Sequence, residues 1–345
     1  MDVKLKEKAK IIILTIIAVT IINLILFPRL LQSPDNPSSN TEVIISSTAE
    51  SPATQTHQES FIFQESFSEI PSATTTSHST SVVAENISAP YAGLYNLSTN
   101  EALYEKCAET KIAPASLTKV LTAVTVLTYM EPDAVIKVGS ELELLPKRSS
   151  LCLIKKGHRL TVYDLLTGML VASGNDAAYT LAVNVARHTM NRNDISNKDA
   201  LSYFSYLMNS MAKRIGCTAS NFTTPDGFDS EGQYTTIQDL MLICNYAMNF
   251  DEICEITSTV KKKVIFNSGE NVTWSNSNKL LHRENPYYYS KAIGMKTGTT
   301  PLAGMSLVAV AEINSEIYMA IVSGCSDEDE RYKSVIKLFN SVYST

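Results

Sequence analysis

The distribution of apolar and polar residues divides the chain into three parts. Residues 11–28 are almost uniformly apolar, whereas residues 29–88 are rich in Ser, Thr, Pro, Asn and Gln. In residues 89–345, apolar positions recur with the spacings that are typical of strands and helices. The pattern therefore predicts one folded domain, preceded by a polar segment and an apolar one.

The folded domain opens with a pattern typical of a β-hairpin, followed by a helix. Apolar residues cluster in residues 91–96 and 102–105, and polar turn residues separate the two segments. Residues 116–130 then carry apolar side chains at helical spacing, which predicts a largely buried helix. Ser116 is expected at the N-terminus of this helix.

The middle of the domain is predicted to be helical. Thr161 can cap a helix over residues 162–172, and the tripeptide 173–175 interrupts the pattern before the next helix. This tripeptide would therefore lie in a loop between two helices. The helices expected after it cover residues 176–188, 203–215 and 236–249.

The last part of the domain returns to strands. Residues 306–313 and 316–324 have strand-like patterns, and residues 329–342 have the pattern of an amphipathic helix. Strands at both ends with helices between them predict an α+β fold. In this fold an antiparallel sheet, formed from both ends of the domain, carries an inserted helical lobe.

The apolar segment predicts insertion into the cell membrane. Its length is at the short end of the roughly 17 to 25 residues that span a bilayer, and four lysines in residues 1–10 precede it. The positive-inside rule places this basic tail in the cytoplasm and the folded domain outside the cell. A cleaved signal peptide is less favoured, because no small-x-small cleavage site follows the apolar run. We expect a single-pass transmembrane signal-anchor over residues 11–28.

The polar segment, residues 29–88, is expected to be a disordered linker. Its composition cannot bury enough apolar surface to offset the entropy of ordering. The formal net charge of −6 is concentrated here, since residues 33–88 contain seven acids and no Lys or Arg, and residues 89–345 carry only −2. A folded domain with so weak a charge is not expected to bind nucleic acid.

Six cysteines are scattered through the folded domain, without a C-x-x-C pair or a nearby histidine at ligand spacing. We therefore expect no metal site and no cofactor. The even number is compatible with disulfides in an exported protein, but buried free thiols are the favoured interpretation for a domain of this size.

Three short motifs point to serine acyl-transfer chemistry. In chain order they are Ser116-x-x-Lys119, Ser173-Gly174-Asn175 and Lys296-Thr297-Gly298. Residues three apart on a helix share a face, so the Lys119 amine can reach the Ser116 hydroxyl and act as its base. A lysine does so only when neutral, which requires burial or a nearby cation such as Lys296 to lower its pKa.

The second and third motifs can supply the remaining functions. The Ser173 hydroxyl can pass a proton between Lys119 and a leaving amine, and Asn175 can hold Lys119 or a substrate amide. Lys296 and Thr297 can bind a terminal carboxylate of the substrate.

One glycine and two backbone amides complete the predicted site. Gly298 would let the substrate backbone approach the strand without a Cβ clash, and the backbone amides of Thr299 and Ser116 could form an oxyanion hole. Each motif alone is weak evidence, but their order and their helix-start, loop and strand contexts together are specific.

From about residue 89 onward the chain resembles the D-alanyl-D-alanine carboxypeptidases, the low-molecular-mass penicillin-binding proteins of serine peptidase family S11. The segments that carry the resemblance are PASLTK, LTVYDLLTGMLVASGNDAA, FTTPDGFDSEGQYTTIQDL, WSNSNKLL and GMKTGTT. The resemblance implies a β-lactamase/transpeptidase-like fold, an acyl-enzyme at Ser116 with Lys119 as base, and a carboxylate-binding Lys296. It also implies that Ser173 and Asn175 form the second catalytic motif, that peptidoglycan stem peptides are substrates, and that β-lactam antibiotics are covalent inhibitors.

Two departures from the family pattern affect details of this expectation. Gly174 occupies a position where the family often has Ala, which is expected to loosen the loop. The chain also ends about 50 residues after Gly298, whereas many members carry a further β-rich domain and an amphipathic anchor there. The N-terminal span is then expected to hold the enzyme at the membrane.

Other activities are compatible with the motifs to different degrees. A peptidoglycan endopeptidase would use the same chemistry, and a catalytically silent β-lactam-binding or β-lactam-sensing module would keep the same fold. A class A β-lactamase needs a Glu between the second and third motifs, and no Glu occurs between Ser173 and Ser230. Removal of the terminal D-alanine from stem peptides is the activity we expect.

Some residues near the motifs are expected to be structural. Asp226 and Asp229 are expected to form turns, and Trp274 and residues 287–289 are expected to serve ordinary packing.

Overall fold

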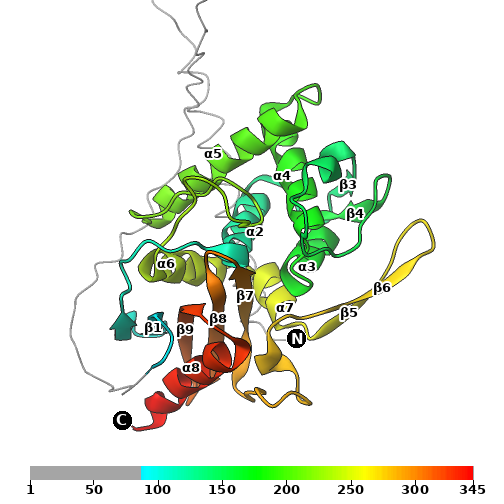
Figure 1. Cartoon of the computed structure of the whole chain (residues 1–345). Coiled ribbons are helices and arrows are strands. Elements are labelled where there is room, and N and C mark those ends of the chain that lie inside the picture. The colour runs from blue at the N-terminus through cyan, green and yellow to red at the C-terminus, as the bar shows by residue number, and fades with distance from the viewer. Residues whose placement is uncertain (1–86, 345) are drawn as a thin grey trace, which may run out of the picture. The chain divides into compact units, whose positions relative to one another are not determined.

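The computed structural model describes residues 87–344, so the predicted cytoplasmic tail, span and nearly all of the predicted linker lie outside the described residues. The central element is an antiparallel sheet with the strand order β2-β1-β9-β8-β7 (Figure 1). Its strands are β1 (Tyr91–Asn96), β2 (Glu101–Lys106), β7 (Ala292–Thr300), β8 (Gly304–Ile313) and β9 (Glu316–Cys325). The prediction of a sheet formed from both ends of the domain is confirmed. Within residues 87–344, no helix has the length and apolar character needed to cross a membrane.

Both faces of the sheet are buried. In β8, Leu307 and Ala309 belong to the apolar cluster that includes α8 (Glu328–Ser341), whereas Val308 and Val310 belong to the cluster that includes the helical lobe. Successive side chains of a strand point to opposite faces, so one strand contributes to both clusters. The sheet is therefore the middle layer, with α8 on one face and the helical lobe on the other.

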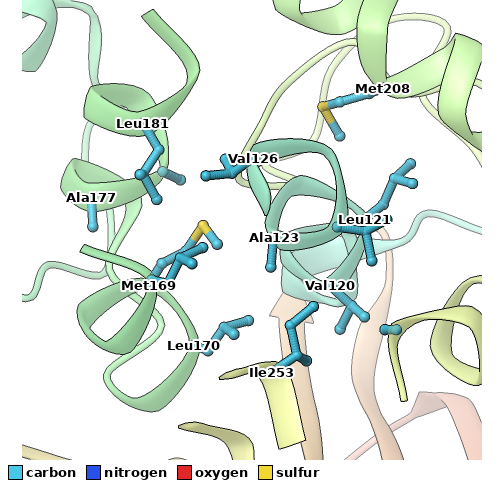
Figure 2. Packing of buried hydrophobic residues seen from close by; sticks show 14 of the residues in the cluster. Val120, Leu121, Ala123, Val126, Met169, Leu170, Ala177, Leu181, Met208 and Ile253 are labelled. Atoms are coloured by element: carbon cyan, nitrogen blue, oxygen red, sulfur yellow. The ribbon is translucent and has the colours of Figure 1, made fainter. Parts of the chain in front are cut away.

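The helical lobe is inserted between β2 and β7. Its helices are α2 (Thr118–Tyr129), α3 (Val162–Val171), α4 (Asn175–Met190), α5 (Asn197–Ile215), α6 (Ile237–Ala247) and α7 (Asp251–Ser258). Figure 2 shows side chains of α2 meeting Met169 and Leu170 of α3, Leu181 of α4 and Met208 of α5. Residues 118–126 of α2 are all buried. Since burying one large apolar side chain stabilises a fold by roughly 1.5–3 kcal/mol, the helix that follows Ser116 is firmly fixed.

Side-chain caps set several helix boundaries. Thr161, Ser196 and Thr236 each accept a hydrogen bond from the backbone N–H three residues further on. The Ser196 cap starts α5 six residues before the predicted start at residue 203. The other predicted helices and strands lie within a few residues of their predicted bounds.

Several small elements were not predicted. They are α7, the 3-10 turns Ser140–Leu144, Lys279–Leu281 and Val342–Ser344, and the hairpins of β3 (Val135–Lys137) with β4 (Arg159–Thr161) and β5 (Lys261–Ile265) with β6 (Asn271–Ser275). Strands of three residues are too short to show an alternating pattern. The β5–β6 hairpin reads Lys261-Lys262-Lys263 at its start, which is not typical of a strand.

Candidate active site

Ser116 and Lys119 form a close pair at the start of α2. Ser116 lies in a 3-10 turn, Ala115–Leu117, that leads directly into the helix. Its Oγ is 2.8 Å from Lys119 Nζ, and Lys119 Nζ donates a second hydrogen bond to the carbonyl oxygen of Asp226 at 2.8 Å. The Lys119 side chain is completely buried. The structure thus brings the predicted nucleophile and the predicted base into contact.

Burial makes Lys119 suitable as a base near neutral pH. Desolvation lowers the pKa of Lys119 to about 8, although the nearby carboxylates of Asp226 and Asp176 act in the opposite direction. The lowered pKa matches the sequence-based expectation, but its main cause is removal from water and not the charge of Lys296.

The backbone around Ser116 is tightly enclosed by glycines. Ala115 has φ 49°, a left-handed conformation that is uncommon for a residue with a side chain. A Cβ on Gly227, which has φ 80°, would lie 1.8 Å from the Ala115 carbonyl oxygen. A Cβ on Gly298 would lie 3.2 Å from the Ser116 nitrogen. Gly298 therefore makes room for the segment that carries the nucleophile, a reason different from the predicted approach of substrate.

Ser173 and Lys296 meet beside this pair. Lys296, in β7, is 1% exposed and donates hydrogen bonds to Ser173 Oγ at 3.0 Å and to the Thr297 carbonyl oxygen at 2.9 Å. Burial, together with the positive charges of Lys119 and Arg331, lowers the pKa of Lys296. A bound anion would favour the charged form of this amine.

Asn175 and Thr299 lie at the site, but Asn175 lacks the expected hydrogen bond to Lys119 among the described residues. Asn175 is buried at the start of α4, and its side chain makes no hydrogen bond to Lys119 or to any other described residue. The Thr299 hydroxyl donates to the Gly298 carbonyl oxygen at 2.7 Å. The oxyanion hole formed by the Thr299 and Ser116 backbone amides stays a prediction.

The loop of the second motif packs closely against Cys152. A Cβ on Gly174 would lie 2.8 Å from Cys152 Sγ. The Asp176 carboxylate accepts hydrogen bonds from the backbone N–H groups of Cys152 at 2.9 Å and Ile154 at 3.1 Å. Gly174 therefore lies where an added Cβ would meet close neighbours, and the expected loosening of the loop stays a prediction.

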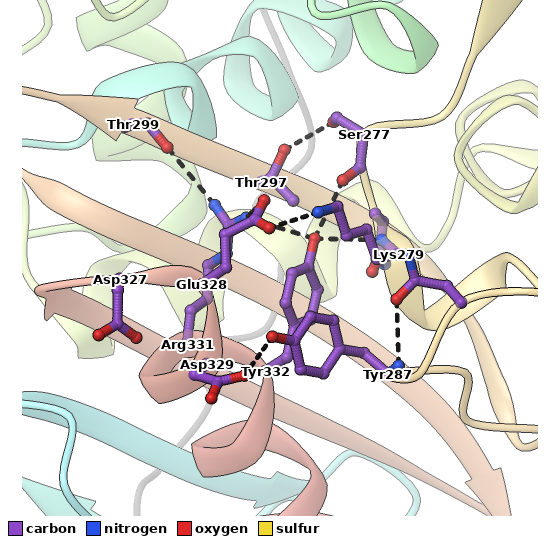
Figure 3. Close-up of polar contacts among 12 residues, drawn as sticks. Ser277, Lys279, Tyr287, Thr297, Thr299, Asp327, Glu328, Asp329, Arg331 and Tyr332 are labelled. Atoms are coloured by element: carbon purple, nitrogen blue, oxygen red, sulfur yellow. Dashed lines mark hydrogen bonds and ion pairs between the residues drawn. The ribbon is translucent and has the colours of Figure 1, made fainter.

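Arg331 is a second buried cation at the site, and sequence reasoning missed it. It is 5% exposed on α8, and its Nη1 lies 3.4 Å from Thr299 Oγ1, next to the third motif (Figure 3). A signal was present in the sequence, because Arg331 precedes Val335 and Leu338 by four and seven residues. It therefore occupies the apolar stripe of an amphipathic helix, where a charged side chain is unusual.

Asp226 and Asp229 do more than form turns. The Asp226 carbonyl oxygen holds Lys119 Nζ, as described above. Asp229 accepts hydrogen bonds from the Thr300 hydroxyl at 2.6 Å and from the Leu302 backbone N–H at 3.1 Å. The loop that contains both aspartates thus ties the predicted base to the end of β7.

The six cysteines are all described and all are free thiols. Cys152, Cys217, Cys244 and Cys325 are buried, whereas Cys107 is exposed and Cys254 is half-buried. Burial is the main cause that raises the pKa of each of the four buried thiols, which keeps them protonated and poorly nucleophilic. Residues 87–344 contain no group of three or more His, Cys, Asp or Glu side chains arranged to hold a metal ion.

Comparison with known families identifies the protein class. The sequence model of peptidase family S11, D-alanyl-D-alanine carboxypeptidase, matches residues 76–326. The chain belongs to this family. This match confirms the resemblance carried by the three motifs and their surrounding segments.

Individual relatives in this S11 family agree with the assignment. D-alanyl-D-alanine carboxypeptidase DacF of Bacillus subtilis is 27% identical over 74% of this chain and 62% of its own length. DacC of Escherichia coli is 31% identical over 71% of this chain and 58% of its own length. The D-alanyl-D-alanine carboxypeptidase of Streptomyces sp. strain K15 is 30% identical over 76% of this chain and 89% of its own length. The chain therefore matches less than two thirds of the first two relatives.

Solved structures show the same fold. The crystal structure of the Streptomyces K15 DD-transpeptidase has a TM-score of 0.69 and 27% identity, over 76% of this chain and 99% of that one. Penicillin-binding protein D2 of Listeria monocytogenes, in its ampicillin-bound form, has a TM-score of 0.61 and 27% identity, over 74% of this chain and 98% of that one. The predicted α+β, β-lactamase/transpeptidase-like fold is confirmed.

Proposed function

We propose that this S11 family member is a serine-type D-alanyl-D-alanine carboxypeptidase, which removes the terminal D-alanine from peptidoglycan stem peptides through an acyl-enzyme at Ser116. The observation that carries the proposal is the 2.8 Å contact between the Ser116 hydroxyl and the completely buried Lys119 amine. The names of its relatives support the substrate class.

In the proposed acylation, each of these groups has a separate part. Neutral Lys119 takes the Ser116 proton while Oγ attacks the carbonyl carbon of the penultimate D-alanine. The Asp226 carbonyl oxygen holds the amine in place during this transfer. The proton then reaches the leaving amine through the Ser173 hydroxyl. Water hydrolyses the resulting ester and restores the free enzyme.

Stabilisation of charge requires two further parts of the site. The backbone amides of Ser116 and Thr299 would bind the oxyanion, and loss of one such donor costs roughly 3 kcal/mol of transition-state stabilisation. The cations of Lys296 and Arg331 would receive the carboxylate of the terminal D-alanine. This anion raises the pKa of Lys296 again, which leaves Lys119 as the neutral amine.

Mass spectrometry of the products from a pentapeptide stem tests the proposal. The purified protein should release one terminal alanine, and Ser116→Ala should release none. Cleavage of cross-linked dimers without loss of this alanine would indicate an endopeptidase. Transfer to an added acceptor amine would indicate a transpeptidase, the name given to the Streptomyces K15 structure. Penicillin labelling without any peptide product would favour a sensor, and rapid penicillin turnover would favour a β-lactamase.

We also propose that residues 11–28 anchor the chain in the cell membrane, with the catalytic domain outside. The support is the sequence pattern of four lysines before an apolar run. N-terminal sequencing of the exported protein should find the start of the chain intact. A mature N-terminus beyond residue 30 would contradict the anchor.

A further inference from the structure

A hydrogen-bonded network surrounds the end of the site that carries Arg331 (Figure 3). It joins β7, the residues 277–279 that follow β6, and the first turns of α8. Tyr332 lies at its centre and is completely buried. We infer that Tyr332 is a positioning residue, whose hydroxyl orients Arg331 and Ser277 and so sets the preference of the site for ligands with a carboxylate. The inference rests on the proposed function, in which Arg331 and Lys296 bind that carboxylate.

The Tyr332 hydroxyl uses its whole hydrogen-bonding capacity. It donates to the Ser277 carbonyl oxygen at 3.0 Å, and it accepts from the Lys279 backbone N–H at 3.1 Å and from Arg331 Nη2 at 3.4 Å. A phenol offers one donor and two acceptor positions, so none is left over. One oxygen atom thus joins the loop at residues 277–279 to the guanidinium on α8.

The Arg331 guanidinium is oriented but only loosely bonded. Nη2 lies 3.3 Å from a Glu328 carboxylate oxygen, Nη1 lies 3.4 Å from Thr299 Oγ1, and the guanidinium carbon lies 4.7 Å from the centre of the Tyr332 ring. The buried Nε has no hydrogen-bond partner among the described residues. Buried donors are normally paired, so an unpaired Nε beside two long Nη contacts leaves the guanidinium without a strong fixed partner.

The same Tyr332 hydroxyl also reaches the third motif from the other side. Ser277, whose carbonyl oxygen it holds, places its own hydroxyl 2.6 Å from Thr297 Oγ1. The Tyr332 hydroxyl also accepts a hydrogen bond from the backbone N–H of Lys279, and the Lys279 side chain forms an ion pair with Glu328. Loss of the hydroxyl would therefore release Arg331 and the Ser277–Thr297 contact together.

Tyr287 provides matched control variants. Its ring stacks on Tyr332 with 4.7 Å between ring centres, and its hydroxyl donates to the Asp329 carboxylate. Tyr287→Phe keeps the stacked ring and touches no contact of Arg331. Tyr287→Ala removes the stacked ring and loosens Tyr332 without deleting any hydrogen bond of Tyr332.

The test compares acylation rates with a penicillin and with its carboxyl methyl ester. The native protein should acylate faster with the free acid. Tyr332→Phe should reduce this acid-to-ester ratio about fivefold to tenfold, as expected for loss of hydrogen bonds to a charged group. Tyr287→Phe should leave the ratio unchanged, and Tyr287→Ala should reduce it to a smaller extent. With Arg331→Met already present, Tyr332→Phe should reduce the ratio less than it does in the native protein, because only the Ser277–Thr297 contact is then left to lose.

Other results would overturn the inference. If Tyr332→Phe slows acid and ester equally, the ratio is unchanged and the hydroxyl is merely structural. If neither rate changes, the hydroxyl has no role in acylation. If Tyr332→Phe does not fold, an unchanged ratio in Tyr287→Ala decides against the inference. Peptide hydrolysis by the native protein separates the two proposals. If the native protein hydrolyses the peptide but the variants keep the native acid-to-ester ratio, only this inference is contradicted. If Tyr332→Phe lowers the ratio but the native protein does not hydrolyse the peptide, only the carboxypeptidase activity is contradicted.

Discussion

Lys119 and Lys296 are both buried amines of one site, but they lie in different parts of the fold and have different hydrogen-bond partners. Lys119 lies on α2 inside the helical lobe, where it is completely buried and two oxygen atoms accept its hydrogen bonds. Lys296 lies on β7 near the polar network of Arg331 and Tyr332. In the proposed mechanism, burial in the lobe makes Lys119 a base, and the network at the sheet positions cations for an anionic group. The catalytic and recognition sides of the site are therefore sensitive to different changes.

The largest effect is expected from Lys119→Met. Acylation should fall by about a thousandfold or more, because Ser116 loses its base. At pH 7 the free energy of unfolding should rise by about 1–3 kcal/mol, because an apolar side chain replaces a desolvated amine.

The size of this stability change depends on pH. In the native protein the pKa of Lys119 is about 8 when folded and near 10.5 when unfolded. The destabilisation caused by the buried lysine is therefore at its maximum below about pH 8 and decreases as pH rises towards 10.5. Urea unfolding of both proteins should show their difference shrinking over this range. A less stable variant at pH 7 would contradict the description of Lys119 as a strained, desolvated base.

The contrast between the two sides also explains what the sequence could predict. Ser116, Lys119 and Lys296 lie in short motifs with fixed spacing, so local sequence was sufficient to find them. The sheet and the main helices followed from long alternating or helical patterns. The hydrogen bond from Lys119 to the Asp226 carbonyl oxygen links residues 107 apart in the sequence. Every residue type has a backbone carbonyl, so the sequence does not show which one will accept this bond.

The recognition side was harder to predict for a related reason. Arg331 lies 35 residues after Lys296 and looks like one more charged residue of the last helix. Its role depends on the packing of α8 against the sheet, which no local pattern specifies. Tyr332 likewise acquires its contacts from the loop at residues 277–279, through tertiary structure alone.

An intermediate effect is expected when pH changes the charge of the base. Acylation by a fluorescent penicillin should rise about tenfold per pH unit below the pKa and level off above it, because only neutral Lys119 accepts the Ser116 proton. Burial places that pKa at about 8. Labelling at short times between about pH 6 and 9 measures the profile. A flat profile below pH 8 would show that the base is already neutral there.

The smallest effect is expected at the second motif, which borders both sides of the site. Gly174→Ala places a Cβ 2.8 Å from Cys152 Sγ, so thermal unfolding should show a loss of about 1–3 kcal/mol from overpacking. The double variant Cys152→Gly/Gly174→Ala should recover part of this loss, because the Cβ and Sγ atoms of Cys152, each 2.8 Å from the new Cβ, are then gone. Losses that simply add would mean that the two residues do not compete for space.

Intact-protein mass spectrometry after brief incubation with a penicillin tests the central claim most directly. The native protein should gain the mass of one penicillin, and peptide mapping should locate it on Ser116. Ser116→Ala should keep its original mass under the same conditions. Equal modification of both proteins, or attachment to another residue, would contradict a nucleophilic Ser116 activated by buried Lys119.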